Sequence, residues 1–483
     1  MKILPFVVFS IILFLTNTSY LFSANHKKIY IQTIDTTSLK LLMKKRHSFS
    51  LTVEKKKRIF FPTKSIQHHS GVNTLIFHSK NKNNRVILTT KNSRTIGTVI
   101  IDGERYEVTT NTKGQLKLTK EDSKFIPPFS SDILLPTMEE NKSITQKVQK
   151  NISLKNTVDA ASTYNGKTII NLMVLYTQAF TNAYGEDTLL LIQNLIDQAN
   201  DAFSYSNIEA SYNLIHIQLT SLSQFDESHT MSEALTNISG DTNIQSLRDL
   251  KKADMVTLLR KYPDTRDGCG VAWLMYDAYQ NNISNFKPNA YSVVEVKRVS
   301  ETTRENPYYC SDMSLAHELG HNLGCTHDRA HSSGSGGLFS YSYGYDFDDS
   351  NNSKDFATIM SYAPKEISYF SNPNIDFQDH PIGITIGIEN EADNASSIRQ
   401  SMQEVSEFYD DCSYGYMPIQ GNRISLTCAK VDTNTTVTIT PCSEGQTFIQ
   451  GTSQCINAIT ESPVNLNDSD SGCQLIQGTI ECL

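Results

Sequence analysis

The sequence predicts a central α/β (α+β) domain with a mixed, mostly parallel sheet. A β-rich region precedes this domain, and a small disulfide-rich extension follows it. Three observations lead to this organisation. Apolar runs of strand length alternate with helical patterns between about residues 161 and 411. Short alternating stretches occur in the preceding region, and six of the nine cysteines lie after residue 411.

Length and composition limit the classes of function. The chain has 483 residues, which exceeds one ordinary domain, and its hydrophobic content of 39% is enough for globular cores. The formal net charge of −8 is mild for this length, and no basic excess indicates a nucleic-acid partner. We therefore expect several domains and no binding of nucleic acid.

The first residues have the pattern of a secretory signal. Lys2 precedes an apolar run from Ile3 to Leu15, and small or polar residues follow up to Ala24. The run is too short to span a bilayer stably. We expect residues 1–24 to be a signal peptide, no membrane span elsewhere, and a secreted, extracellular protein.

Residues 25–160 are expected to form a β-rich domain that ends in a linker. The stretch "GTVIIDGERYEVTT" (97–110) alternates like two strands around a hairpin turn at Asp102-Gly103. Residues 125–167 are polar, broken by prolines and weakly periodic, which indicates an exposed linker.

Residues 161–411 have the strand and helix pattern of the central domain. The run "TIINLMVLYT" (168–177) has strand length, and residues 188–208 repeat apolar positions at helical spacing. A last helix is expected over 391–409. Further strands are expected at 211–219, 253–259, 270–275 and 290–296.

The segment "LAHELGHNLGCTHD" (315–328) predicts a helix from about 312 to 324, capped by Ser311 or Asp312. Each residue of a helix advances by 100°. The leucines of this segment therefore form one stripe that faces the core. The first two histidines lie one turn apart, on a side that points away from the leucine stripe.

Three histidines of this segment can converge on one metal ion. His317 and His321 are spaced i, i+4 on one helical face, and Gly324 allows the left-handed turn that brings His327 back. Three imidazoles with one open position are typical of a catalytic zinc site, in which Glu318 would act as the base. The alternative is an ordinary helix whose histidines are surface residues or satisfied core residues, which does not explain this combination of spacings.

A methionine turn follows the histidines. His-Glu-x-x-His-x-x-Gly-x-x-His with such a turn is the metzincin pattern, and "ATIMSYAP" (357–364) places Met360 33 residues after His327. The chain therefore resembles the metzincin zinc metalloproteases. The resemblance implies that Met360 lies as an apolar floor beneath the histidines, although Met360 alone would suggest only a buried core methionine.

The aspartate after the third histidine makes the segment similar to the adamalysin/reprolysin group. In that group the residue, here Asp328, is structural; a solvated loop charge is the alternative. "CGVAWL", "AYSVVE" and "YFSNPN" resemble bacterial secreted reprolysin-like proteases, over about residues 165–410. Tyr362 instead resembles the tyrosine of astacins and serralysins, which can bind zinc and stabilise the transition state. Its alternative role is a packed aromatic side chain in the cleft wall.

The resemblance also implies where substrate binds. In metzincins an extended substrate pairs with an edge strand above the cleft by main-chain hydrogen bonds. Residues from about 362 to 374 would shape the pocket beyond the scissile bond. The expected edge strand comprises Gly270, Val271, Ala272, Trp273 and Leu274, of which Trp273 is better explained as a core residue.

A secreted protease with about 140 residues before its catalytic domain is expected to be a zymogen. Residues 25–160 would then be its prodomain. Related families block zinc with a prodomain cysteine, but no cysteine precedes Cys269 here. A carboxylate, a backbone group or steric cover would have to block the metal instead.

Helix geometry limits the disulfides. Cys310 and Cys325 flank the predicted helix, which at about 1.5 Å per residue holds them roughly 18 Å apart. A disulfide needs Cα atoms closer than about 7 Å, so these two cysteines cannot pair. We expect Cys269–Cys310 first and Cys269–Cys325 second. The six cysteines of residues 412–483 are expected to form a stapled module of unknown pairing.

The sequence therefore predicts a secreted zinc-dependent metalloendopeptidase that acts on protein or peptide substrates and is most simply a monomer. The alternative is a secreted adhesin that keeps the fold without turnover and binds through its C-terminal module. Loss of Glu318 would favour the adhesin, and Glu318 is present. Asp346, Asp348 and Asp349 could hold a structural Ca²⁺, although a solvated acidic loop explains them better.

Overall fold

The computed structural model divides the chain into two compact units, Met1–Tyr409 and Asp410–Leu483. Most of the expected signal peptide lies outside the described residues. The structure describes residues 20–22, 27–68, 70–80, 84–127, 132–136, 163–164, 167–264, 268–332, 336–348, 355–362 and 365–409, and short strand segments after residue 415.

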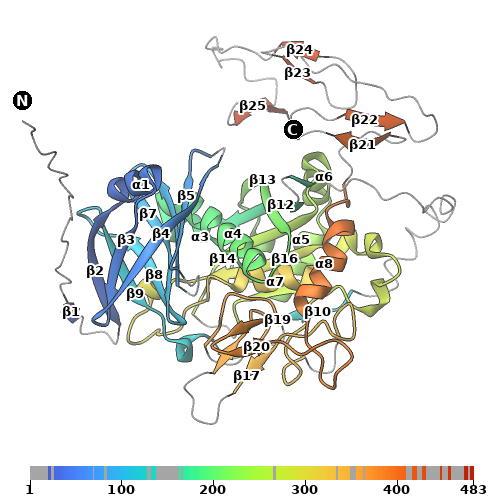
Figure 1. Cartoon of the computed structure of the whole chain (residues 1–483). Coiled ribbons are helices and arrows are strands. Elements are labelled where there is room, and N and C mark those ends of the chain that lie inside the picture. The colour runs from blue at the N-terminus through green and yellow to red at the C-terminus, as the bar shows by residue number, and fades with distance from the viewer. Residues whose placement is uncertain are drawn as a thin grey trace, which may run out of the picture. The chain divides into compact units, whose positions relative to one another are not determined.

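Antiparallel strands form an N-terminal sheet, drawn in blue and cyan in Figure 1. The turn between its strands β7 and β8 confirms the predicted hairpin, because Asp102 and Gly103 have φ angles of +54° and +84°. The helix α1 (Thr36–Lys45) follows β2. In sheet order the strands are β1 (Tyr20–Phe22), β2 (Lys28–Asp35), β9 (Gln115–Lys120), β8 (Glu104–Thr110), β7 (Arg94–Ile101), β6 (Arg85–Lys91), β5 (Asn73–His78), β4 (Lys56–Gln67) and β3 (Phe49–Val53).

The two faces of this sheet differ in chemistry. Side chains of one face, such as Phe77 and Leu88, pack with Leu39 of α1 in an apolar cluster. Successive residues of a strand point to opposite faces. The opposite face therefore carries residues such as Thr74 and Thr89, which are also fully buried. The N-terminal sheet is thus covered on both sides.

The central sheet has the mixed, mostly parallel topology that the sequence predicts. Four of its strands, β12, β13, β14 and β16, pair in parallel, and β15 is antiparallel to β16. These strands coincide closely with the predicted ranges. The sheet comprises β10 (Ile133–Leu134), β15 (Gly270–Trp273), β16 (Tyr291–Val296), β14 (Met255–Lys261), β12 (Lys167–Thr177) and β11 (Thr163–Tyr164) in that order, with β13 (Ala210–Thr220) paired to β12.

Helices cover the central sheet, and α4 lies between the two sheets (Figure 1). The apolar side chains of α4 pack in the main core, as its predicted periodicity requires. No helix in the part of the chain that the structure describes has the length and apolar content needed to cross a bilayer. The helices are α3 (Gln178–Tyr184), α4 (Thr188–Tyr205), α5 (Met231–Gly240), α6 (Thr242–Lys251), α7 (Ser314–Asn322) and α8 (Asn394–Val405).

Short antiparallel pairs complete both units. In the first unit these are β17 (Asp346–Phe347) with β18 (Phe356–Ala357), and β19 (Asn372–Phe377) with β20 (His380–Ile382). In the second unit they are β21 (Tyr416–Gln420) with β22 (Thr427–Lys430), β23 (Gln446–Phe448) with β24 (Cys455–Asn457), and β25 (Cys473–Ile476) with β26 (Thr479–Cys482).

Two expectations need correction. The expected exposed linker of residues 125–167 is wrong at β10, because β10 joins the central sheet as a strand parallel to β15. The helix α7 begins at Ser314 and has Met313 at its N-cap position, so neither Ser311 nor Asp312 caps it as expected. The Ser311 hydroxyl instead accepts a hydrogen bond from the Met313 amide, at 3.1 Å.

Candidate metal centre

The helix α7 and the turn after it bring three buried histidines together. His317 and His321 lie one turn apart on α7, and His327 returns to them after the helix ends. Their relative exposures are 7%, 0% and 1%, respectively. Histidine is only intermediate in its tendency to be fully buried, so three such side chains together are unusual. The cluster therefore requires an explanation other than surface solvation.

Gly324 makes the return of the chain possible. Its φ angle is +89°, in the left-handed region that favours glycine. A Cβ atom at this position would lie 2.5 Å from the Cβ atom of Leu338, so both conformation and space require glycine. The turn that the sequence predicts after the helix is therefore present.

The second ring nitrogens of two histidines fix the tautomer of each ring. The Nδ1 atom of His317 lies 2.7 Å from the Ile359 carbonyl oxygen, and that of His321 lies 2.8 Å from the Cys325 carbonyl oxygen. A carbonyl oxygen can only accept a hydrogen bond, so both Nδ1 atoms carry the proton. The Nε2 atoms are then left with free lone pairs, as metal-binding histidines require.

The Nε2 atoms converge at distances that suit a metal ion. The Nε2 atom of His327 lies 3.1 Å from the Nε2 atoms of both His317 and His321. Ligands at about 2.0 Å from a tetrahedral zinc ion are about 3.3 Å apart, from the usual Zn–N distance. Burial also lowers the pKa of His321 to about 4, which favours the neutral ring that binds metal. The residues present therefore fit zinc.

Glu318 lies beside these rings on the same helix. It is 2% exposed, and its Oε2 atom has no hydrogen-bond partner among the described residues. Burial raises the pKa of Glu318 well above its usual value, and the nearby Asp132 carboxylate raises it further. A buried carboxylate with a raised pKa is a suitable proton acceptor next to a metal site.

Glycine at the start of β15 makes room for Glu318. A Cβ atom on Gly270 would lie 2.3 Å from the Oε1 atom of Glu318. Any larger residue at position 270 would displace the Glu318 side chain or the strand. Gly270, expected from the sequence only as part of a substrate strand, therefore also positions Glu318.

Met360 packs against α7 at Gly320, the residue before His321. Met360 is fully buried, and a Cβ atom on Gly320 would lie 2.7 Å from the Met360 sulfur atom. The Met360 carbonyl oxygen accepts a hydrogen bond from the Asp328 amide, at 3.0 Å. The methionine turn and the histidine loop are therefore joined directly.

Asp328 links the loop of the third histidine to the turn at Met360. Its carboxylate accepts hydrogen bonds from the Ser361 hydroxyl at 2.9 Å and from the Tyr362 amide at 3.2 Å. The Nδ1 atom of His331 lies 2.7 Å from the same carboxylate. Asp328 is 2% exposed, so these contacts describe it better than a solvated loop charge does.

Tyr362 extends its hydroxyl group into the histidine cluster. The hydroxyl oxygen lies 3.3 Å from the Nε2 atom of His317, and the ring stands edge-to-face against His327. The side chain is therefore within reach of any group bound between the histidines.

Asp132 completes the cluster and is not among the site residues predicted from the sequence. This residue is 4% exposed and lies directly before β10. Its Oδ1 atom lies 2.9 Å from the His327 Nε2 atom, and its Oδ2 atom lies 3.3 Å from the His317 Nε2 atom. The ligand atoms of Asp132 and the three histidines all lie within 4.8 Å of one another. The apolar residues after Asp132, in an otherwise polar stretch, were the only sequence signal.

The strand β15 lies above the cluster and is paired on both sides. One edge of β15 pairs with β16. The other edge pairs with β10, where the Ala272 amide donates to the Asp132 carbonyl oxygen at 3.0 Å and the Leu274 amide donates to the Leu134 carbonyl oxygen at 2.9 Å. Val271 and Leu274 are buried. Trp273 is partly buried and packs against the core, and its indole donates to the Ser239 hydroxyl at 3.3 Å. The expected substrate edge is therefore filled by this chain itself.

A disulfide connects β15 with the approach to α7. Cys269 and Cys310 are joined with their Cα atoms 5.6 Å apart. Cys325 is buried beside α8 and lies outside this disulfide. Among the described residues, the histidine and Asp132 cluster is the grouping that could hold a metal. It does not include Asp346 or Asp348 of the expected calcium loop, and Asp349 lies outside the described residues.

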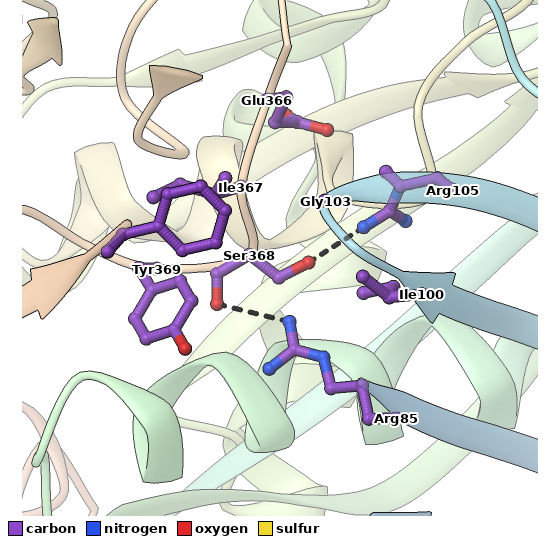
Figure 2. Close-up of a pocket in the computed structure, with 9 residues that line it drawn as sticks. Arg85, Ile100, Gly103, Arg105, Glu366, Ile367, Ser368 and Tyr369 are labelled. Atoms are coloured by element: carbon purple, nitrogen blue, oxygen red, sulfur yellow. Dashed lines mark hydrogen bonds between the residues drawn. The ribbon is translucent and has the colours of Figure 1, made fainter. Parts of the chain in front are cut away.

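A polar seam joins the N-terminal sheet to the central domain. We define the seam as the contact of β5–β8 with α4 and residues 366–369. In it, the guanidinium of Arg105 donates to the Ser368 hydroxyl at 2.7 Å, and that of Arg85 donates to the Ser368 carbonyl at 3.4 Å (Figure 2). Arg85 also pairs with Asp201 of α4 at 3.2 Å, and both side chains are buried. The seam was not expected from the sequence.

Comparison with known proteins relates this chain to metallopeptidases. Residues 166–371 match the family model Reprolysin_5, described as metallo-peptidase family M12. A peptidyl-Asp metalloendopeptidase of Pseudomonas aeruginosa is 26% identical over 268 residues, which cover 50% of this chain and 40% of that protein. Another, of Stenotrophomonas maltophilia, is 27% identical over 232 residues, which cover 46% of this chain and 49% of that protein.

The chain thus spans less than half the length of these two relatives. Among solved structures, metalloproteinase-II from Bacteroides fragilis is similar with a TM-score of 0.40 and 15% sequence identity. That similarity covers 70% of this chain and 92% of the other. A TM-score this low does not establish a common fold for the two chains.

Proposed function

We propose that this chain, in which residues 166–371 form a reprolysin-like domain of metallopeptidase family M12, is a zinc metalloendopeptidase. One observation carries the proposal. The Nε2 atoms of His317, His321 and His327 converge at ligand spacing, beside the buried Glu318 carboxylate. In this arrangement the three histidines would hold a zinc ion, which would supply the Lewis acidity of a catalytic zinc site.

The residues around the ion divide the chemistry of peptide hydrolysis. Zinc, when bound, supplies the Lewis acidity that polarises the scissile carbonyl group and the attacking water. Glu318 accepts the proton of that water and passes it to the leaving amine nitrogen. The Tyr362 hydroxyl, 3.3 Å from the His317 Nε2 atom, is placed to donate a hydrogen bond to the carbonyl oxygen as it becomes negative.

The substrates are proteins or peptides that bind in an extended form. The backbone of β15 offers main-chain groups for strand addition once its outer edge is free. Since the relatives named above are peptidyl-Asp metalloendopeptidases, we propose bonds next to aspartate as the first cleavage sites to examine.

The chain is made as a secreted zymogen in this proposal. The signal pattern of residues 1–24 and the N-terminal domain of residues 25–160 support export and latency, respectively. Removal of the residues up to about 160 is expected to raise activity. Equal activity of the full-length and trimmed proteins, at matched zinc content, would contradict the zymogen proposal.

The deciding experiment combines metal analysis with cleavage of a peptide library. Wild-type protein and Glu318→Gln should both contain one zinc per chain, and only the wild type, after trimming, should cleave peptides. Glu209→Gln changes an exposed glutamate of the same domain and serves as the matched control. The control should cleave like the wild type. Peptide cleavage that survives a chelator, or that persists in Glu318→Gln, would contradict the proposed function.

The adhesin alternative predicts a different result. A binding protein would retain cell or matrix binding in Glu318→Gln and would lose it when residues 413–483 are deleted. The protease proposal instead expects the deletion to leave hydrolysis of casein intact.

A further inference from the structure

We propose that the central domain carries a guanidinium socket, which Arg85 fills in the full-length chain and which binds an arginine side chain of the substrate once the N-terminal domain is removed. The socket is defined by Asp201 and Tyr205 near the end of α4 and by Ser368 and Tyr369. The substrate role rests on the proposed function, because it names a side chain that the same enzyme would select. The binding of a guanidinium group does not depend on that function.

The socket surrounds the guanidinium group of Arg85 with contacts that suit this group. The Ser368 carbonyl oxygen accepts a hydrogen bond from Nη2 at 3.4 Å (Figure 2), and the Asp201 carboxylate lies 3.2 Å from Nη1. The guanidinium carbon lies 4.0 Å from the ring centroid of Tyr205 and 5.7 Å from that of Tyr369. A planar guanidinium group stacks on aromatic rings and pairs with carboxylates, whereas an ammonium group is a compact point charge. The socket is therefore suited to arginine better than to lysine.

The charge contact in the socket is buried. The side chains of Arg85 and Asp201 are 4% and 5% exposed, respectively. A carboxylate in such a place is costly unless a cation pairs with it. Removal of the N-terminal domain takes Arg85 away, and the Asp201 carboxylate then needs water or another cation. An arginine side chain from a second molecule would restore the lost contacts.

The walls of the socket are held by the central domain itself. The rings of Tyr205 and Tyr369 stand edge-to-face, with their centroids 5.4 Å apart. The next residue, Phe370, is fixed to the end of α4, because its amide donates to the Ser206 hydroxyl at 2.8 Å. These contacts do not involve the N-terminal sheet. We therefore expect the socket to keep its shape when Arg85 leaves.

Two hydrogen bonds connect the socket with the candidate metal centre. The Ile359 amide donates to the Tyr369 carbonyl oxygen at 2.9 Å, and the Ile359 carbonyl oxygen accepts from His317 Nδ1 at 2.7 Å. Ser368 and Tyr369 also lie in the segment expected to shape the pocket beyond the scissile bond. An extended peptide advances about 3.3 Å per residue. An arginine a few residues after the scissile bond is therefore the side chain that we expect in the socket.

The first test fills an emptied socket with a free guanidinium compound. Arg85→Ala in the full-length chain removes the group that ethylguanidinium restores. The melting temperature is measured at increasing millimolar concentrations of ethylguanidinium and, separately, of ethylammonium, which has the same charge without the planar group. Ethylguanidinium should raise the melting temperature of Arg85→Ala to a plateau, by on the order of 2 °C, because it binds the folded state. Ethylammonium should not.

Two controls separate the socket from a general effect of the salt. The wild type keeps Arg85 in the socket, and Arg94→Ala removes a more exposed arginine at the same boundary. Neither protein should respond to ethylguanidinium. The proposal would be overturned if Arg85→Ala showed no saturable shift, or if ethylammonium or Arg94→Ala gave an equal one.

The second test needs no change at position 85. Wild-type protein, trimmed and freed of its N-terminal domain, is given pairs of peptides that differ only in arginine or citrulline, a neutral side chain of similar shape. The pair is placed in turn at each position after the scissile bond. One position should favour arginine by on the order of tenfold in KM, because the buried carboxylate pairs only with the charged side chain. The kcat value should change much less.

Two further measurements assign this preference to the socket. Ethylguanidinium should compete with the arginine peptide and leave cleavage of the citrulline peptide unchanged. Asp201→Asn should remove the preference for arginine, whereas Asp187→Asn, at the other end of α4, should keep it.

The outcomes distinguish the socket from the proposed function. If ethylguanidinium stabilises Arg85→Ala but the trimmed wild type cleaves no peptide, the binding site stands, and the proposed function fails together with the substrate role. If the trimmed protein cleaves arginine and citrulline peptides equally at every position, the substrate role fails and the proposed function stands.

Discussion

The two sides of the candidate metal site are encoded in different ways. The proposed catalytic side, with the three histidines and Glu318, comes from eleven consecutive residues, 317–327, on one helix and one turn. The opposing side comes from Asp132 and from β5–β8, more than 180 residues earlier in the chain. The first side is formed by residues close together in sequence, whereas the second forms only when segments far apart in sequence pack together. The histidine cluster and the segments that cover it are therefore built by separable parts of the molecule.

The two sides of α4 also make contacts of different chemistry. The inner side of α4 packs apolar residues in the core, whereas its outer side buries polar residues against the N-terminal sheet. There Asn194 donates to the Thr89 hydroxyl at 2.9 Å, and Asp201 pairs with Arg85. Polar surfaces regain hydrogen bonds with water when they part, but apolar surfaces do not. The seam is suited to opening without exposing a core.

The largest expected effect lies on the catalytic side. His321→Ala removes a metal ligand, and even changes to groups behind the ligands cost about 10–100-fold in metal affinity. We expect loss of stoichiometric zinc and of peptide hydrolysis, measured by metal analysis and kinetics after trimming. His47→Ala, at an exposed site of the N-terminal domain, should change neither. If His321→Ala retained one zinc ion per chain, His321 would not be a required metal ligand.

The next effect lies on the opposing side. Arg85→Ala leaves Asp201 buried without its partner, and such changes cost about 3–5 kcal/mol. The exposed pair of Arg94 with Asp187 is a matched control at the same boundary, where Arg94→Ala should cost below about 1 kcal/mol. Denaturant unfolding of the full-length chain measures both. Equal losses in the free energy of unfolding for Arg85→Ala and Arg94→Ala would show that burial of the ion pair does not increase its contribution to stability.

Removal of the disulfide tests whether the stability of the central domain depends on the N-terminal domain. Cys269 and Cys310 are 41 residues apart in sequence, so their closed loop contributes about 4 kcal/mol in the chain-entropy model. The double substitution to serine should lower the stability of full-length and trimmed proteins alike, because both residues lie in the central domain. A loss confined to the full-length protein would place the effect at the seam instead.

The smallest effect is a dependence of the seam on pH. Burial raises the pKa of Glu121 to about 7, and the cause next in size, the charge of Arg105, opposes this. Asp312, Glu107 and Glu366 raise it further. An acid with a raised pKa stabilises the fold while protonated, so this contribution is present below about pH 4.5 and is lost as the pH rises through about 7.

We therefore expect the melting temperature of the full-length chain to fall by a few degrees between about pH 5 and 8. Glu121→Gln should flatten this fall, and the trimmed protein should lack the part that depends on Glu121. A wild-type slope in Glu121→Gln would assign the pH dependence to other groups.

Local patterns made half of this molecule predictable. The strands of the central sheet are continuous apolar runs, because both of their faces are buried, and Asp102-Gly103 demands its turn. The fixed spacing of the histidine segment gave the helix, the return at Gly324 and the convergence of the rings. These features depend on neighbours within about a dozen residues.

The rest depends on contacts between segments far apart in sequence. Asp132 lies in a polar stretch, and only its pairing with β15 shows that it is buried. The polar side of α4 has the composition of a solvent-facing surface, and only the N-terminal sheet reveals it as an interface. A sequence carries no local signal for such partners, because any exposed helix would have the same pattern.

The contact between Gly270 and Glu318 would make two steps of the proposed reaction interdependent. A Cβ atom on Gly270 would lie 2.3 Å from the Glu318 Oε1 atom, so the backbone of β15 lies directly against the carboxylate that we propose accepts the proton. A peptide that draws β15 outward, or presses it inward, must also move that carboxylate relative to the water it activates. We expect shortened peptides, which make fewer main-chain hydrogen bonds to β15, to have a lower turnover number as well as a lower affinity.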